Sequence, residues 1–188
     1  MQEEIPFNIG HRIPEGQLRA VPDDLDEMHR AVDWLVERAT SAKSAVERAR
    51  MLGLAGGYAG IVGDVDRASR LLREAIELAQ QAEDPKITLT LHIRLADAIA
   101  GSGRPRDAAE LLETHLQRIH EDPTLEPLRD FVHQHLGKAL LEAGEIQAGI
   151  DHLEHALRIR QEKGDPELHA STEQALRVAR ESPEKHGT

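Results

Sequence analysis

The sequence contains no cysteine, which excludes a disulfide framework and thiol chemistry. Aromatic residues make up only 2% of the chain, too few to form a recognition surface on their own. No stretch approaches the roughly 18 apolar residues that a membrane-spanning helix needs, and the first residues form neither a basic region nor an apolar run. From these absences we expect a cytoplasmic protein.

Positive charge is also in short supply. Lysine and arginine total 23 against 34 aspartates and glutamates, which gives a formal net charge of −11. Nucleic acids and anionic membranes attract proteins that carry a positive patch, and the sequence has no basic stripe that would override the overall balance. We therefore expect neither nucleic acid nor membrane as a partner.

Motifs for catalysis are missing too, since the chain has no P-loop, nucleophile elbow, zincin helix motif or glycine fingerprint after a strand. Among the 11 histidines, His152 and His155 lie one helical turn apart and are spaced to share a metal ion, whereas His133 and His135 point to different faces of one helix. No further ligand follows at a suitable spacing. We therefore interpret the histidines as solvated or packed between helices, with His92 and His133 at the edge of the core, and predict no enzyme, metal or cofactor.

What the sequence does contain is an internal repeat of about 40 residues. Gly63, Gly103 and Gly144 are 40 and 41 residues apart, and a small residue follows each glycine after five positions and precedes it by seven: Ala68, Ala108 and Gly149, and Gly56, Ala96 and Gly137. Small residues that face each other let two antiparallel helices approach closely. A period of 20–50 residues is typical of a solenoid, in which each unit buries its apolar face against the next.

Helix boundaries follow from turn glycines and from aspartates that precede proline. Asp84, Asp122 and Asp165 each stand before a proline, the arrangement of an N-cap followed by the first helical residue. The pattern predicts eight helices and no strand, over residues 24–40, 42–62, 64–82, 85–101, 105–121, 124–143, 145–163 and 166–181.

Three regions are expected along the chain. Residues 1–23 contain Pro6, Pro14 and Pro22 and no helical period, and they predict an extended N-terminal arm. Residues 24–181 form a single helical repeat domain, which begins with the second helix of a repeat that lacks its first and ends with a capping helix. Residues 182–188 are polar and predict a flexible tail.

The repeat resembles the tetratricopeptide (TPR) repeat over roughly residues 24–181, through its small-residue and glycine positions. The long period, and residues 156–160 followed by Gly164, Asp165 and Pro166, are most similar to the kinesin-light-chain type. The chain departs from the family at the usual tryptophan position, where it has Leu52, His92 and His133. The resemblance implies an all-α, right-handed superhelical solenoid of antiparallel helix pairs, with about three full repeats, a half repeat and a C-terminal capping helix.

The resemblance also implies a concave groove that is lined by the first helix of each repeat. The corresponding residues are Arg50, Gly53, Gly57, Thr90, Ile93, Arg94, Asp97, Phe131, Gln134, His135, Lys138 and Leu141. Family members that bind chaperone tails use paired lysines and asparagines, whereas the single asparagine here, Asn8, lies outside every repeat. We therefore expect a different protein or peptide partner, basic or amphipathic in character.

Glycines at positions 53, 57 and 60 on one helix face need an explanation, because glycine inside a helix costs up to ~1 kcal/mol relative to alanine. One interpretation is close helix packing; the other is a smooth trough that holds the arm or a partner. We expect the arm to cover helices 24–40 and 42–62, with Trp34 partly buried beneath it, and to leave the groove open. The expected anchors of the arm are Phe7, Ile9 and Ile13.

Two functions fit these features. The first is a non-catalytic interaction module that acts as an adaptor, scaffold or inhibitory partner. The alternative is a regulatory domain that responds to a peptide or ligand and signals to an associated protein. The absence of a recognisable output domain favours the first, and no oligomeric state follows from the pattern.

Overall fold

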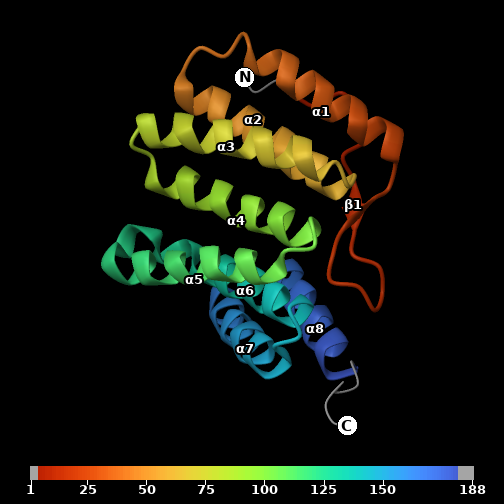
Figure 1. The fold of residues 1–188 in the computed structure, drawn as a ribbon, viewed down its shortest axis with the longest axis vertical. Coiled ribbons are helices and arrows are strands. Elements are labelled where there is room, and N and C mark those ends of the chain that lie inside the picture. The colour runs from red at the N-terminus through yellow and green to blue at the C-terminus, as the bar shows by residue number, and fades with distance from the viewer. Residues whose placement is uncertain (1–3, 182–188) are drawn as a thin grey trace.

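The computed structural model describes residues 4–181, and within them the predicted all-α solenoid is confirmed (Figure 1). The predicted tail, 182–188, lies outside the described residues. Consecutive helices pack against each other along the whole stack. The helices are α1 Leu25–Ala39, α2 Ala45–Ile61, α3 Val65–Gln81, α4 Pro85–Gly101, α5 Pro105–Glu121, α6 Arg129–Glu142, α7 Ile146–Lys163 and α8 Pro166–Glu181.

Most helices begin and end at the residues that the sequence indicates. The Asp84 carboxylate accepts a hydrogen bond from Ile87 N at 2.9 Å, and the Asp165 carboxylate accepts one from Leu168 N at 3.1 Å. The glycines at positions 63, 103 and 144 have φ values of +84°, +81° and +84°, a left-handed conformation that glycine adopts without steric cost. Glu83 takes the same role between α3 and α4 with φ +52°.

Two predicted helix starts are wrong. The helix expected at 124 is preceded by a 3₁₀ helix, η1 Pro123–Leu128, and α6 begins only at Arg129. Pro127 explains the delay, because it has no N–H to donate within an α-helix that began at Pro123. The helix expected at 42 begins at Ala45, where the Ser44 hydroxyl accepts from Glu47 N at 3.1 Å.

The small residues of the repeat allow close helix crossings, as predicted. A Cβ added to Gly137 would lie 2.9 Å from Gly149 O and 2.8 Å from Leu153 Cγ, so α6 and α7 come together at the backbone. In the first crossing, a Cβ on Gly56 would lie 2.6 Å from Leu72 Cγ. Ala68, on the same second helix, has no exposed surface.

The stack curves because its two layers pack differently. The first helices of the repeats (α2, α4, α6 and α8) contact one another in sequence, whereas within residues 4–181 no two second helices do so to a similar extent. Three apolar clusters run between the layers from α1 to α8. The first helices therefore form the inner, concave side, which is where the groove residues were expected.

A buried ionic network joins the last three helices. Arg160 Nε, on α7, donates to Asp130 Oδ2 of α6 at 3.0 Å, and the two side chains are 2% and 0% exposed. Arg160 Nη1 also donates to Thr172 Oγ1 of α8 at 2.7 Å and to Leu168 O at 3.0 Å. Lys163 Nζ contacts the second Asp130 oxygen. The negative charge of Asp130 is thus matched inside the protein.

The arm contains a short hairpin. β1 His11–Arg12 pairs antiparallel with β2 Val21–Pro22, and Gln17 N donates to Pro14 O at 3.1 Å in the turn between them. The expectation that strands are absent is wrong for this two-residue pair. We call residues 10–23 the hairpin below, since Asp23 N also donates to Gly10 O at 2.9 Å.

The first part of the arm lies against the N-terminal helices as predicted, through Ile5 and Asn8, but the hairpin then runs on from α1 to α8, which corrects the predicted course of the rest of the arm (Figure 1). Arg19 Nη1 donates to Asp97 O of α4 at 3.1 Å, and Gln174 Nε2 of α8 donates to Ile13 O and Pro14 O, each at 3.0 Å. The predicted anchors are also wrong. The arm residues that pack against the core clusters are Ile5, at the cluster that Trp34 also joins, and Leu18, at the C-terminal cluster.

Candidate binding groove

The predicted groove residues divide into an accessible set and a buried set. Arg50 is exposed, and seven others are partly exposed: Gly57, Thr90, Arg94, Asp97, Phe131, His135 and Lys138. Gly53, Ile93, Gln134 and Leu141 are buried. The accessible surface is therefore mostly polar and lies over α4 and α6, whereas the buried set belongs to the packing between the inner helices.

Asp97 and His135 form the centre of this surface. His135 Nδ1 lies 2.7 Å from Asp97 Oδ1, and the side chains are 21% and 46% exposed. Desolvation acts to raise the pKa of the Asp97 carboxyl, but the charge and hydrogen bond of His135 outweigh it and, with Lys138 and Arg19, lower the pKa below its usual value. The sequence predicted both residues in the groove, and the structure brings them into contact.

Arg94 fills the space beside the glycines of α2. A Cβ on Gly57 would lie 3.5 Å from Arg94 Cδ, and one on Gly53 would collide with Leu91 Cδ2. Burial lowers the pKa of the Arg94 guanidinium, and burial raises the pKa of the neighbouring Tyr58 hydroxyl. Side chains of α4 thus occupy the predicted trough at Gly53 and Gly57, so close packing is the correct interpretation there.

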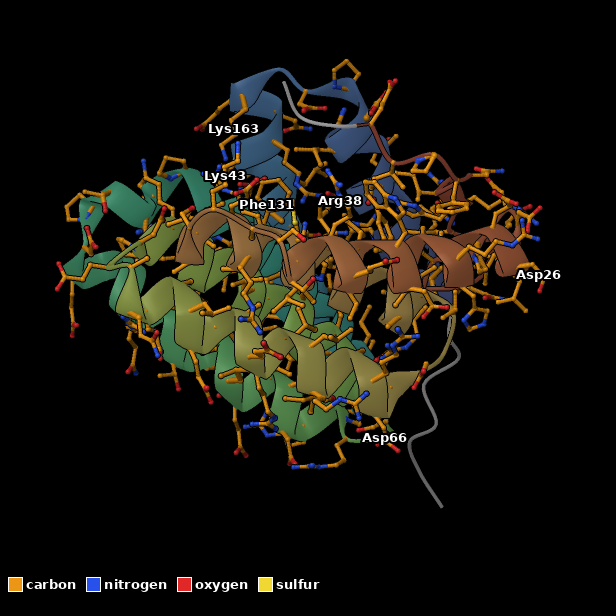
Figure 2. The ribbon with its side chains drawn as sticks, turned by 90° about the horizontal axis from the view of Figure 1, so that it is seen from above. Asp26, Arg38, Lys43, Asp66, Phe131 and Lys163 are labelled. Carbon is orange, nitrogen blue, oxygen red and sulfur yellow. The ribbon has the colours of Figure 1, made fainter. Side chains whose placement is uncertain are left out.

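Phe131 forms the other end of the surface, and two cations, the buried Arg160 and the partly exposed Lys163, pack against its ring. The Phe131 ring centroid lies 5.3 Å from Arg160 Cζ and 5.9 Å from Lys163 Nζ, both within cation–π range. Phe131 and Lys163 are labelled in Figure 2. Close by in sequence, Gln134 is 3% exposed, and its Oε1 has no hydrogen-bond partner within residues 4–181. This end of the groove combines an aromatic face with positive charge.

Sequence reasoning missed the residues that meet the hairpin. These are Arg19 and Leu18 in the hairpin itself, Glu142 at the end of α6, and Gln174 on α8. None of them lies at a groove position of the repeat, and each contacts a residue far away in sequence. Arg19 is one of several charged residues in the arm, so its charge alone did not point to a specific contact.

Four histidines pack between helices and others, such as His120 and His155, are exposed, in agreement with the interpretation of the sequence. His133 Nδ1 of α6 lies 2.9 Å from His152 Nδ1 of α7, and the His92 and His115 rings lie 4.4 Å apart between α4 and α5. Burial is the main cause that lowers the pKa of His115, and likewise of His133, to about 4. Within the described part of the chain, no three histidine or acidic side chains are placed to hold a metal ion.

Comparison with known proteins bears on the fold. No family model matches the sequence, and no curated protein matches it. A crystal structure of Podosopora anserina "putative kinesin light chain nearly identical TPR-like repeats" is 21% identical, covers 82% of this chain and 79% of that chain, and has a TM-score of 0.57. Its Q17M variant is 21% identical, with 82% and 78% covered and a TM-score of 0.58.

This likeness shows a TPR-like fold, which confirms the resemblance found in the sequence at the level of fold. Solenoids of this kind form extended concave surfaces. No helix in residues 4–181 combines the length and apolar character needed to cross a membrane.

Proposed function

We propose that this TPR-like solenoid is a non-catalytic interaction module that binds a protein or peptide segment on the inner face of α4 and α6. The observation that carries the proposal is the polar cluster of Arg94, Asp97, His135 and Lys138, which is partly exposed on the concave side. Core packing does not require a hydrogen-bonded acid and imidazole at this position. A mixed polar surface of this kind suits recognition of a partner chain.

The proposed partner is basic or amphipathic. Acidic groups at Asp97 and Glu142 favour a cationic residue at one end of the groove, and the face of Phe131 favours an apolar or planar group at the other. The net charge of −11 further favours a partner of opposite sign over nucleic acid or an anionic membrane. We propose a cytoplasmic location and no requirement for a metal or cofactor.

One observation favours the alternative, a domain that responds to a peptide or ligand. The arm contacts α1 through Asn8, and its hairpin contacts α4, α6 and α8, so a ligand that moved the arm would alter contacts at both ends of the stack. The two functions share one binding surface. They differ in whether binding changes the relative positions of the terminal helices.

The proposed function is tested by selecting a displayed random-peptide library on the purified full chain. We expect the enriched peptides to lose about tenfold in affinity, ~1.4 kcal/mol, when Thr90→Arg adds bulk and positive charge to the groove. Glu77→Lys, an exposed position on the outer helix α3, is the matched control and should leave affinity unchanged. Enriched peptides that bind the groove variants as tightly as the unaltered chain would contradict the proposal.

A further inference from the structure

The hairpin places an arginine in a site that several helices build together. Arg19 Nη1 donates to Asp97 O, near the end of α4, at 3.1 Å, and Arg19 Nη2 pairs with the Glu142 carboxylate at the end of α6. The Glu142 side chain is 21% exposed. A Cβ added to Gly101 would lie 3.1 Å from Arg19 Nη1, so a larger residue at 101 would press on the guanidinium. The site therefore offers two acceptors and the space for a planar cation.

The same site recognises two further features of the hairpin. Leu18 packs against the C-terminal apolar cluster, which contains Leu141, Leu153 and Leu176. Gln174 Nε2 donates to two successive backbone carbonyls, those of Ile13 and Pro14, at 3.0 Å each. Backbone carbonyls are present in any extended chain, whereas the apolar and cationic contacts select particular side chains. We call the contact surface of Asp97, Glu142, Leu141, Leu176 and Gln174 the rim site.

The hairpin depends on the rim site for its order more than on its own hydrogen bonds. Its ladder joins only His11–Arg12 to Val21–Pro22, and a two-stranded hairpin in isolation is marginally stable at best. Its exposed ion pair, Arg12 with Asp23 at 2.7 Å, adds little. The contacts with α4, α6 and α8 hold the segment in place, as they would hold a bound peptide.

We propose that the rim site is a recognition site for an extended segment of a partner protein that carries a leucine followed by an arginine, and that the hairpin is its occupant in the free chain. The inference rests on the proposed function, because it names the chemistry of the partner for that module. A partner segment takes the place of residues 10–23, puts its guanidinium between Asp97 O and Glu142, and seats its leucine on the apolar cluster.

Geometry at the rim site favours arginine over lysine. The two Nη atoms of Arg19 reach two separate acceptors at once, one a carbonyl and one a carboxylate. A lysine ammonium is a single point of charge on a flexible stem and does not present donors in a planar fork. The partner segment should therefore bind more weakly when its arginine is replaced by lysine, and should fail to bind when it is replaced by glutamate.

The test uses the full chain with Leu18→Ser and Arg19→Glu, which releases the hairpin, and a fluorescent synthetic peptide of residues 10–23. Fluorescence anisotropy should show the peptide binding the released chain at least about tenfold more tightly than the unaltered chain. A peptide with Arg19→Glu should not bind the released chain. Arg12→Glu in the full chain is the matched control, because Arg12 pairs with Asp23 inside the hairpin and should leave the rim site occupied.

The proposal is overturned if the released chain, helical by circular dichroism, does not bind the peptide. If the released chain loses its helicity, a second experiment reverses the charges of the two partners. The peptide with Arg19→Glu should bind the full chain that carries Glu142→Arg and Leu18→Ser. Failure of this peptide to bind that chain overturns the proposal. Library peptides that lose affinity with Thr90→Arg but do not compete with the hairpin peptide would leave the proposed function intact and refute the rim site alone.

Discussion

Arg160 and Asp130 form an ion pair that is almost completely enclosed by α6, α7 and α8, with Arg160 Nε 3.0 Å from Asp130 Oδ2. Arg160 also donates to Thr172 Oγ1, so the pair connects the last helix to the repeat before it. Such a pair is costly to break, because the remaining charge is left buried without a partner. The capping helix is therefore held by charge as well as by apolar packing.

We predict that Asp130→Ala lowers the free energy of unfolding by about 3–5 kcal/mol, since it leaves Arg160 buried and unpaired. Urea denaturation followed by circular dichroism measures the effect. The control is Glu74→Ala, which removes the exposed pair of Glu74 with Arg48 and should cost no more than about 1 kcal/mol. Equal losses of unfolding free energy from the two variants would mean that burial does not make the pair of Asp130 and Arg160 more costly to break than an exposed pair.

Two glycine substitutions should shift stability in opposite directions. Gly137→Ala places a Cβ 2.9 Å from Gly149 O, where neither helix backbone has room to move, and should cost about 1–3 kcal/mol. Gly57→Ala meets Arg94 Cδ at an ordinary 3.5 Å and should gain up to about 1 kcal/mol from helix propensity. Thermal melting of both variants checks the pair. If both substitutions shift the melting temperature in the same direction, the close contact of α6 and α7 at Gly137 and Gly149 is wrong.

The turn between α3 and α4 lacks the left-handed glycine found in the α2–α3, α4–α5, α6–α7 and α7–α8 turns. Glu83 adopts φ +52° there, a left-handed conformation that costs a side-chain-bearing residue roughly 1–2 kcal/mol. Glu83→Gly should therefore raise the free energy of unfolding by about 1 kcal/mol, less the extra chain entropy of glycine. Gly103→Ala, at φ +81° in the next turn, should lower it by a similar amount. Chemical denaturation of both variants gives the comparison.

Acid should destabilise the protein through its packed histidines. The pKa of His115 is about 4 in the folded protein, against 6.5 for an unperturbed histidine, because burial disfavours the charged ring. Between these values the unfolded chain binds a proton that the folded chain does not, so stability is full above pH 6.5 and falls as the pH drops toward 4. The slope reaches about 1.4 kcal/mol per pH unit for this histidine.

The measurement is urea denaturation at a series of pH values from neutral to mildly acidic. His115→Gln removes one titrating group and should flatten the loss of stability relative to the unaltered chain. Gln80→Ala, at an exposed position of the outer helix α3 that carries no titrating group, is the control and should leave the pH dependence as it was. A pH dependence that His115→Gln does not change would contradict the role of burial.

The repeat pattern predicted the helices well because its determinants are local. Gly103 sets a turn, Asp84 caps a helix, and Gly137 faces Gly149 at a fixed spacing, so each feature is readable within one repeat. The delayed start of α6 was also readable, since Pro127 is incompatible with an α-helix begun at Pro123.

The course of the arm was not predictable in the same way. Its contacts join Arg19 to Asp97 and Glu142, and Ile13 to Gln174, across 78, 123 and 161 residues. No periodicity connects positions so far apart. The open alternative of a trough along the glycines of α2 could not be decided from the sequence for a related reason. Leu91 of the following repeat fills the space beside Gly53, and the rotamer of Leu91 is set only when the two helices pack.

The N-terminal arm, from Asn8 through the hairpin, also changes how the array should unfold. In an open row of repeats each unit touches only its neighbours, so the terminal units fray first and the transition broadens. Here one segment contacts both Glu27 on the first helix and Gln174 on the last, so the two ends of the stack are linked through the arm. Neither end is then free to melt by itself. Loss of order at α1 and at α8 becomes one event, with a cooperativity that a linear stack of the same length lacks.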